Sequence, residues 1–253
     1  MGFGAKPQHF NHATYLVRVM FNVLHYDTIG STNDEARRLA AEGAEHGTVV
    51  HADEQKSGRG RLARTWFSPP GNLYMSVLLR LDLPPGRISE LSFVAAVAVA
   101  EAVAGLAPKK CEIIVKWPND VLVDGGKIAG ILVENADDST ILGIGLNVLE
   151  APTTAGYKTM TLAGCGGIAS VDGARDLLLL ELERLITHWL DRGFAPIREA
   201  WLARGHALGT PLVVNMQGQM MEGAFIGLDQ DGALLLDTPD GPRRIVVGDV
   251  SAV

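Results

Sequence analysis

The residues best suited to chemistry lie in a loop where glycine alternates with arginine, Gly58 to Arg64 (GRGRLAR). Arginine stays charged and offers forked donors that match carboxylate and phosphate groups, while glycine lets a ligand approach the backbone closely. The loop is therefore predicted to bind an anion and to order around it. On its charge alone, a solvated basic loop without a ligand is an equally good interpretation.

Two familiar nucleotide-binding motifs do not account for this loop. Its first six residues satisfy the pattern Gly-x-Gly-x-x-Ala, but a dinucleotide-binding fingerprint must open a helix, and Pro69-Pro70 leaves almost no room for one. The Walker A lysine motif occurs nowhere in the chain. If the protein binds a nucleotide, a loop of this kind must hold it.

A second group of candidate residues flanks a predicted tight turn. Lys116 to Asp120 (KWPND) precedes the turn, and Lys127 to Leu132 (KIAGIL) follows it. Lys127 lies among apolar residues, so it either faces solvent at a sheet edge, which is the default for such a lysine, or is held inward to meet an anion. Gly130 marks a place where a ligand or a packed element approaches the backbone.

Three further polar residues could each be either a site residue or a structural residue. Asn119 and Asp120 either belong to a site or cap the hairpin, because their side-chain types favour turns. Asn147, within Gly143 to Val148 (GIGLNV), is either a site residue or a structural one. The glycines of that segment permit close approach to a buried strand.

The composition limits the classes of protein that fit. The 253 residues are 47% hydrophobic and 20% charged, as in ordinary globular proteins. The net charge of -7 argues against binding a nucleic-acid backbone over the whole surface. The two cysteines, Cys111 and Cys165, have neither the spacing of a disulfide framework nor that of a zinc site, which favours a reducing cytoplasm.

Neither an export signal nor a membrane span is expected. The start of the chain lacks the basic, apolar and small-residue order of a signal peptide, and Arg18 interrupts its apolar run Ala13–Leu24. The longest apolar stretch, Leu91–Ala107, contains Glu101 and is short for a bilayer span. That stretch is predicted to be a buried helix.

Periodicity predicts the elements that position the candidate residues. The predicted helices are Asn33–Glu42, Leu91–Gly105 and Asp172–Trp189. The predicted strands are Val23–Tyr26, Thr48–Ala52, Asn72–Leu83, Glu112–Trp117, Val121–Val123, Lys127–Glu134 and Ile141–Val148. The first helix is expected to open with a capping box, formed by Ser31 with Asp34 or by Thr32 with Glu35, and Gly43 closes it.

The predicted strands and helices together indicate an α+β fold, followed by a second domain with a different sequence pattern. After Leu208 the sequence consists of short apolar runs separated by turn pairs such as Gln217-Gly218 and Asp231-Gly232, without a helical period. This pattern predicts a small β-barrel. The predicted domains are therefore 1–207 and 208–253.

Taken together, the motifs closely resemble those of the biotin protein ligase family. The resemblance rests on segments in the family's order and spacing: Ser31–Asn33, Gln55, Gly58–Arg64, Trp66, Lys116–Asp120, Lys127–Leu132 and Gly143–Val148. It runs at motif level from Tyr26 to Val148 and, less specifically, to the C-terminal barrel.

The resemblance implies a fold, a reaction and a partner. The fold is a mixed β-sheet with helices packed on one side, plus a small C-terminal SH3-like β-barrel. In the reaction, the carboxylate of biotin attacks the α-phosphate of ATP, pyrophosphate leaves, and a carrier lysine attacks the biotinyl-5'-AMP. Mg²⁺ would accompany ATP. The implied partner is the biotin carboxyl carrier protein domain of acetyl-CoA carboxylase or of another biotin-dependent carboxylase.

The resemblance also implies residue roles, with Lys127 and Arg61 as the catalytic pair. Their charges would offset the repulsion between carboxylate and α-phosphate. The residues implied at biotin are Ser31, Thr32, Asn33, Gln55, Gly58, Arg59, Gly60, Arg61, Lys127 and Gly130. Those implied at the nucleotide are Arg61, Arg64, Trp66, Lys116, Asn119, Asp120 and Asn147. Trp66 is expected beside adenine, with a core tryptophan as the alternative, and no metal ligand is assigned.

This sequence departs from the family pattern in the loop and at its start. Leu62 stands where a second arginine is common, and Ala63 where many members have glycine, so loop closure is expected to differ. Few residues precede Ser31, too few for the helix-turn-helix domain that some relatives carry. A monofunctional cytoplasmic ligase is expected, without a DNA or membrane partner, and with a homodimer as one arrangement that the sheet edge could support.

Two other functions are weighed against this one. A lipoate or octanoate ligase or transferase of the same fold would carry a serine, glycine and histidine segment instead of repeated Gly-Arg. A non-catalytic biotin-binding sensor would keep the pocket without turnover, and the retention of both Lys127 and Arg61 argues against it.

Overall fold

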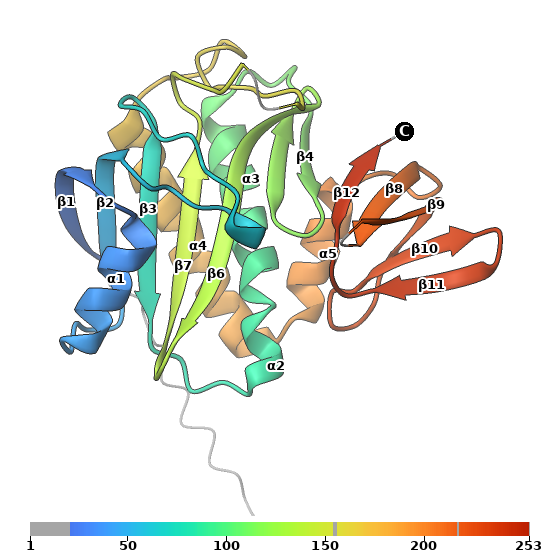
Figure 1. Ribbon diagram of the computed structural model, residues 1–253, viewed down its shortest axis with the longest axis horizontal. Helices are drawn as coiled ribbons and strands as arrows, with labels where there is room; N and C mark the ends of the chain where they lie inside the picture. The colour runs from blue at the N-terminus through green and yellow to red at the C-terminus, as the bar shows by residue number, and fades with distance from the viewer. Residues whose placement is uncertain (1–20, 154–155, 217, 253) are drawn as a thin grey trace, which may run out of the picture.

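A seven-stranded mixed sheet forms the body of the larger domain (Figure 1). The computed structural model describes residues 21–153, 156–216 and 218–252. Most of the apolar run Ala13–Leu24, which is not expected to be a signal peptide, lies outside the described residues. The strand order is β1-β2-β3-β7-β6-β5-β4, with β1 and β2 parallel and the other neighbours antiparallel. The strands are β1 Asn22–Ile29, β2 Thr48–Gln55, β3 Leu73–Leu79, β4 Ile113–Lys116, β5 Asp120–Val123, β6 Gly126–Ala136 and β7 Ser139–Leu146.

Helices α3 (Leu91–Leu106), α4 (Val171–Arg192) and α5 (Ala195–Arg204) cover one face of this sheet, which confirms the predicted architecture. The short α2 (Pro85–Ile88) leads into α3. On the opposite face lies α1 (Thr32–Ala41), over a separate small core. Strand side chains alternate between the two faces, so Val49 joins the large core and Val50 the small one.

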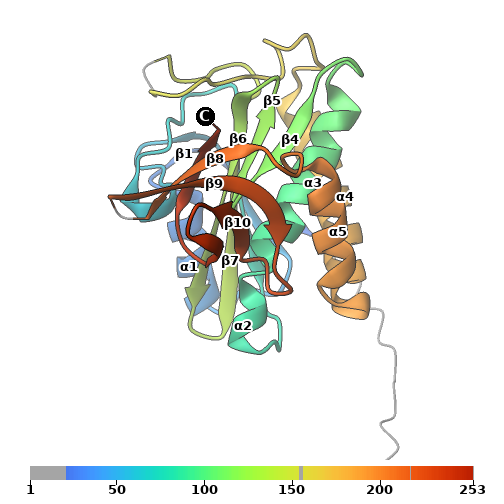
Figure 2. The same ribbon diagram turned by 90° about the vertical axis from the view of Figure 1, so that its right-hand side faces the viewer.

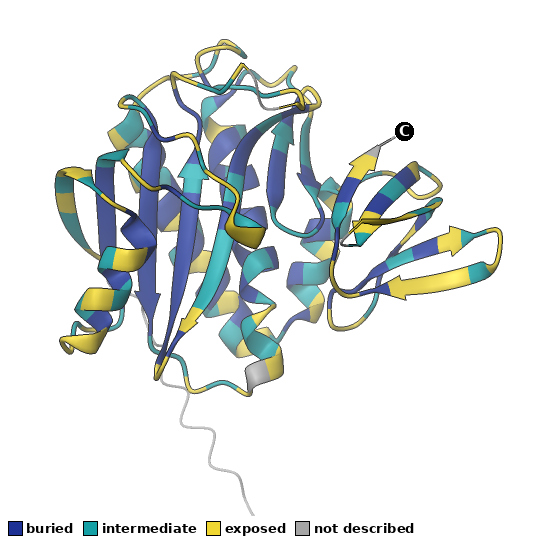
Figure 3. Cartoon of the chain, in the orientation of Figure 1, coloured by how far each residue is buried: buried dark blue, intermediate teal, exposed yellow. Residues whose placement is uncertain are grey.

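The long apolar helix α3 is a core helix, as predicted. By length and composition, Gly86–Leu106 could cross a membrane. However, 61% of its 18-residue apolar window is buried inside the protein. It packs against β4, β5 and β6 of the sheet and against α4 and α5, and its Phe93 packs edge-on against Trp201 of α5. Figure 3 shows the same buried layer behind the central strands.

The start of α1 differs from the predicted capping box. Ser31 is the N-cap residue, but its side chain makes no capping hydrogen bond, and Asp34 and Glu35 pair with arginines instead. The backbone N–H of Thr32 donates to Gln55 Oε1 at 2.8 Å. A side chain from β2 thus satisfies the helix start, which brings β2 and α1 together at the site.

The C-terminal domain is a curved five-stranded antiparallel sheet beside the larger domain (Figure 2). Its strands are β8 Pro211–Met216, β9 Gln219–Leu228, β10 Leu234–Thr238, β11 Gly241–Ile245 and β12 Asp249–Ala252. The strand order runs from β11 to β12, so over the described residues the expected small barrel is not closed. Its apolar side chains, such as Phe225 and Leu236, continue the core of the larger domain.

Candidate active site

A cavity of about 760 Å³ lies where α1, the Gly-Arg loop, β6, β7 and β12 meet. Most of the residues predicted for the site line it together. They are Ser31, Thr32, Asn33, Gln55, Arg59, Gly60, Arg61, Arg64, Trp66, Lys116, Asn119, Asp120, Lys127, Gly130 and Asn147.

Gly58 is the predicted site residue that does not line the cavity. A Cβ atom at this position would lie 2.4 Å from Ser68 Oγ and 2.7 Å from the backbone oxygen of Trp66. The carbonyl of Gly58 also accepts a hydrogen bond from the Trp66 N–H. The absence of a side chain here is therefore explained by packing at the base of the loop.

A buried polar network occupies the end of the cavity beside α1. Gln55 Oε1 lies 3.1 Å from Thr32 Oγ1, and Ser76 Oγ lies 2.8 Å from the same hydroxyl and 2.6 Å from Asn33 Oδ1. Ser76 is fully buried on β3 and was not among the predicted residues. These hydroxyl and amide groups can both donate to and accept from a compact polar ligand.

Arg59 is committed to acidic partners on and near α1. Its guanidinium donates two hydrogen bonds to Asp34, at 2.5 and 2.6 Å, and lies 3.8 Å from Glu134. The hydrogen bonds from Arg59 lower the pKa of Asp34, against a smaller opposing effect of burial. One end of the Gly-Arg loop is thus held by the larger domain.

The other end of the loop is held by the C-terminal domain. Arg64 donates to the carboxylate of Asp249 on β12, and Arg61 Nη1 lies 3.6 Å from the same carboxylate. Arg61 also donates to the Gly248 carbonyl at 3.3 Å, and Lys116 Nζ donates to the Val250 carbonyl at 3.0 Å. The start of β12 therefore forms part of the cavity wall. No local sequence signal marks Asp249, since it lies 185 positions from Arg64.

Lys127 is turned inward, so the edge-solvated interpretation is wrong. Its side chain is 18% exposed, and Nζ lies 2.7 Å from Asp120 Oδ1, whose second oxygen lies 3.3 Å from Lys116 Nζ. The backbone explains the burial: Lys127 pairs with Thr159 in an isolated bridge, so a following segment covers this end of the strand. Tyr157 of that segment places its ring 5.7 Å from Nζ.

Trp66 lies flat against the sheet, on two glycines. A Cβ atom would lie 2.9 Å from the Trp66 ring at Gly130 and 2.5 Å from it at Gly145, and Lys127 Nζ lies 5.4 Å from the ring centre. Its indole Nε1 is buried and has no hydrogen-bond partner among the described residues. These contacts give a physical reason for glycine at both strand positions.

Two predicted amide residues are tied to the backbone. Asn147 Nδ2 lies 3.3 Å from the Lys127 carbonyl and 3.2 Å from that of Met160, and Asn119 Nδ2 donates to the Ile131 carbonyl at 2.6 Å. Both side chains hold segments of the cavity wall in place. Asn119 Oδ1 in turn accepts from Arg61 at 3.3 Å.

The two departures in the loop share an unusual backbone. Leu62 and Ala63 have φ values of 55° and 56°, and the Leu62 side chain is 59% exposed at the loop tip. Glycine adopts this left-handed region freely, whereas a residue with a Cβ atom is strained there. The loop therefore adopts this backbone with leucine and alanine, without a glycine at either position.

Comparison with known proteins agrees with this geometry. The chain matches the Biotin/lipoate A/B protein ligase family over residues 26–149 and the Biotin protein ligase C terminal domain over 208–252. It is 34% identical to the bifunctional ligase/repressor BirA of Bacillus subtilis over 90% of this chain and 73% of that protein. It is 36% identical to a biotin–acetyl-CoA-carboxylase ligase of Paracoccus denitrificans over 87% of this chain and 96% of that one.

A solved structure shares both domains. The biotin protein ligase from Aquifex aeolicus in complex with biotin and ATP superposes with a TM-score of 0.80 at 27% identity, covering 91% of this chain and 97% of that one. The chain belongs to the biotin protein ligase family.

Proposed function

We propose that the cavity carries out the two half-reactions of a biotin–protein ligase. The chain activates biotin with ATP to biotinyl-5'-AMP and transfers the biotinyl group to a lysine of a carrier protein. The observation that carries this proposal is the convergence on one cavity of Lys127, Arg61 and the Thr32–Gln55 network. This set combines fixed cations for an anionic reaction with neutral donors and acceptors for a polar ring.

In the first half-reaction a carboxylate oxygen of biotin attacks the α-phosphorus of ATP, and the bond to pyrophosphate breaks. Two anionic groups must meet, so the barrier falls when fixed positive charges lie beside both. We assign this role to Lys127 and Arg61, with Arg64 and Lys116 along the phosphates. Asp120, 8% exposed, holds the two lysine ammonium groups in place at 2.7 and 3.3 Å.

In the second half-reaction the uncharged amine of the carrier lysine attacks the carbonyl carbon of biotinyl-5'-AMP. An amide bond forms, AMP leaves with the bonding pair, and the nitrogen loses a proton. We assign biotin's ring to the network of Thr32, Gln55 and Asn33, and the adenine to the face of Trp66 left open to the cavity. Ser31, Arg59, Gly60 and Gly130 complete the predicted biotin side, with Asn119 and Asn147 as wall residues.

The residues present also fit the Mg²⁺ that accompanies ATP. Mg²⁺ binds through one or two carboxylates plus substrate phosphates and retains several waters. Asp120 would supply a carboxylate from the cavity lining. When bound, the ion neutralises charge on the phosphates and on the departing pyrophosphate.

The carrier partner and the cellular setting are part of the same proposal. We infer that the partner is a biotin carboxyl carrier protein domain of acetyl-CoA carboxylase or of a related carboxylase, which the relative from Paracoccus denitrificans supports by its name. The net charge of -7 supports the absence of a DNA partner. Both cysteines are free thiols, which is compatible with a reducing cytoplasm.

The proposal is tested by pyrophosphate release from purified protein with Mg²⁺ and ATP, with biotin, lipoate or octanoate as the single acid. Release with biotin alone is the expected result. Release with lipoate or octanoate in place of biotin would show that this other acid is the substrate. Biotin binding in calorimetry without release under any condition would instead indicate a sensor module.

A further inference from the structure

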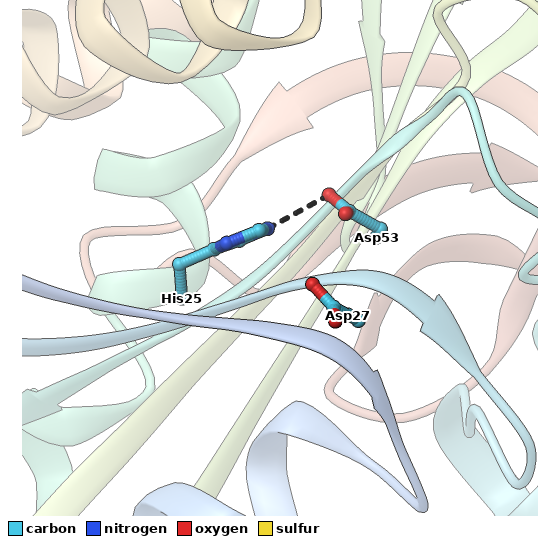
Figure 4. A group of neighbouring side chains, drawn as sticks. All are labelled: His25, Asp27 and Asp53. Atoms are coloured by element: carbon cyan, nitrogen blue, oxygen red, sulfur yellow. Dashed lines mark hydrogen bonds and ion pairs between the residues drawn. The ribbon is translucent and has the colours of Figure 1, made fainter.

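A cluster of metal-binding side chains lies on the outer edge of the sheet, apart from the cavity. His25 and Asp27 come from β1 and Asp53 from β2 (Figure 4). Their candidate ligand atoms all lie within 4.8 Å of one another, and His25 Nε2 lies 2.9 Å from Asp53 Oδ1. None of the three lines the cavity.

Strand register explains why these side chains converge. The parallel pairing of Tyr26 with Ala52 and Thr28 with Glu54 sets Asp27 level with Asp53. His25 lies two residues before Asp27, so all three side chains project from the same face of the sheet. The cluster is therefore built into regular backbone and does not depend on a loop conformation.

The charges of the cluster are incompletely balanced. The His25 imidazole is hydrogen-bonded to Asp53, and the Asp27 side chain has no hydrogen bond or ion pair to any part of the chain that the structure describes. The side chains of His25 and Asp53 are about half exposed, 49% and 48%, so an ion from solvent can reach them. A cation here would neutralise both acids.

His51, a buried histidine beside the cluster, is a second and independent observation at this edge of the sheet. It pairs with His25 in the strand register, and the two ring centres are 5.2 Å apart. His51 is only 2% exposed, and both of its ring nitrogens are buried without a hydrogen-bond partner in the described structure. An imidazole ring always has at least one nitrogen that can donate a hydrogen bond, so this buried ring lies beside the cluster with its hydrogen-bonding capacity unused.

The nearby arginine, Arg175, does not neutralise the carboxylates of the cluster. Arg175 of α4 lies near His51, but its guanidinium is paired with Asp172 at 2.7 Å and with Asp176 at 2.8 Å. The carboxylates of the cluster are thus left to His25 and solvent.

We propose that His25, Asp27 and Asp53 form a binding site for a divalent transition-metal ion, with Zn²⁺ as the fitting ion. One imidazole nitrogen with carboxylate oxygens suits Zn²⁺, whereas Mg²⁺ and Ca²⁺ prefer oxygen alone. Ligand distances of about 2.1 Å place tetrahedral ligand atoms about 3.4 Å apart, which exposed side chains reach by small rotations. The ion would join edge strand β1 to β2, directly before the residues that open α1.

The test uses untagged, metal-stripped full-length protein titrated with Zn²⁺ by calorimetry and with Co²⁺ by visible absorption. Saturable binding of one ion per chain and a rise in melting temperature with Zn²⁺ are expected. His25→Ala and Asp27→Asn should each weaken binding about tenfold or more, because loss of even an outer partner of a ligand costs about 10-fold to 100-fold.

The matched control is His188→Ala, which removes an exposed histidine of α4 far from the cluster and should leave the affinity unchanged. Melting curves without metal show whether each variant is folded. Absence of saturable Zn²⁺ binding would overturn the proposal. So would binding that survives both variants, which would place the ion elsewhere, for example at Asp120 in the cavity.

Discussion

The two faces of the seven-stranded sheet use the same strands for different purposes. On β7, Leu146 is buried in the large core and does not line the cavity, while its neighbour Gly145 faces the cavity and lies under the ring of Trp66. Because side chains alternate along a strand, one face can be packed for stability while the other is left open for a ligand. Substitutions one residue apart should therefore affect different properties.

The largest expected effect of such a substitution is at Gly145. A side chain in Gly145→Val would meet the Trp66 ring at 2.5 Å and displace it from the cavity wall. We expect biotinyl-AMP formation to fall about 100-fold, because small displacements of positioning groups can cost that much. The measurement is kcat/KM for biotin-dependent pyrophosphate release.

Ile128→Val is the matched control, at a buried residue of the large core on the neighbouring strand β6 that does not line the cavity. It should lower the free energy of unfolding by about 0.5–1.5 kcal/mol, the usual result for this truncation in a core, and leave catalysis almost unchanged. Equal losses of activity in both variants would contradict the separation of the two faces.

A smaller effect is expected where the C-terminal domain meets the loop. Asp249→Asn removes the charge that orients Arg61 and Arg64. Since partly exposed ion pairs contribute about 0.2–1 kcal/mol, the KM for ATP should rise up to about fivefold with little change in kcat.

Asp231→Asn serves as the control for this contact, because Asp231 pairs with Arg244 inside the C-terminal domain. That variant should keep the wild-type KM for ATP. A lower KM in Asp249→Asn would mean that Asp249 competes with the nucleotide for the arginines.

The smallest effect is expected at the other end of the loop, in the pH dependence of stability. Arg59 lowers the pKa of Asp34, so the ion pair stabilises the fold at neutral pH and this contribution is lost as pH falls through the lowered pKa. Asp34 is about half exposed, so Asp34→Asn should destabilise by no more than about 1 kcal/mol at neutral pH. Urea unfolding over a pH series should show the difference shrinking in acid; a constant difference would contradict the assignment.

Much of the fold was predictable because it depends on local patterns. The tight turn predicted between Asp120 and Lys127, which lies at Asp124-Gly125, the alternating strands and the long apolar helix each have short-range signals, and the structure places them as predicted. Helix α5 was not predicted, because it is only ten residues long and only two of its side chains, Ile197 and Trp201, are buried, which leaves a weak helical pattern. Its position is fixed by tertiary packing of Trp201 and Ile197 in the core.

The residue types of the site were predictable, but the hydrogen bonds and ion pairs between its residues were not. Motif residues such as Arg61 and Lys127 lie in the cavity, yet the partners Asp249 and Ser76 have no motif and come from distant strands. The inward direction of Lys127 depends on the segment that pairs with it through Thr159, which periodicity alone does not reveal. Long-range contacts of this kind need the assembled fold.

The most direct test of the account is a rapid-quench measurement of biotinyl-AMP formation by Lys127→Ala. We expect a rate about 10² to 10³ lower, as for removal of one charge-stabilising donor, in a variant that is still folded at the assay temperature. Lys109→Ala, at an exposed lysine outside the cavity, should keep the wild-type rate. A Lys127→Ala variant that forms the adenylate at the wild-type rate would contradict the role of Lys127 and the proposed mechanism built on it.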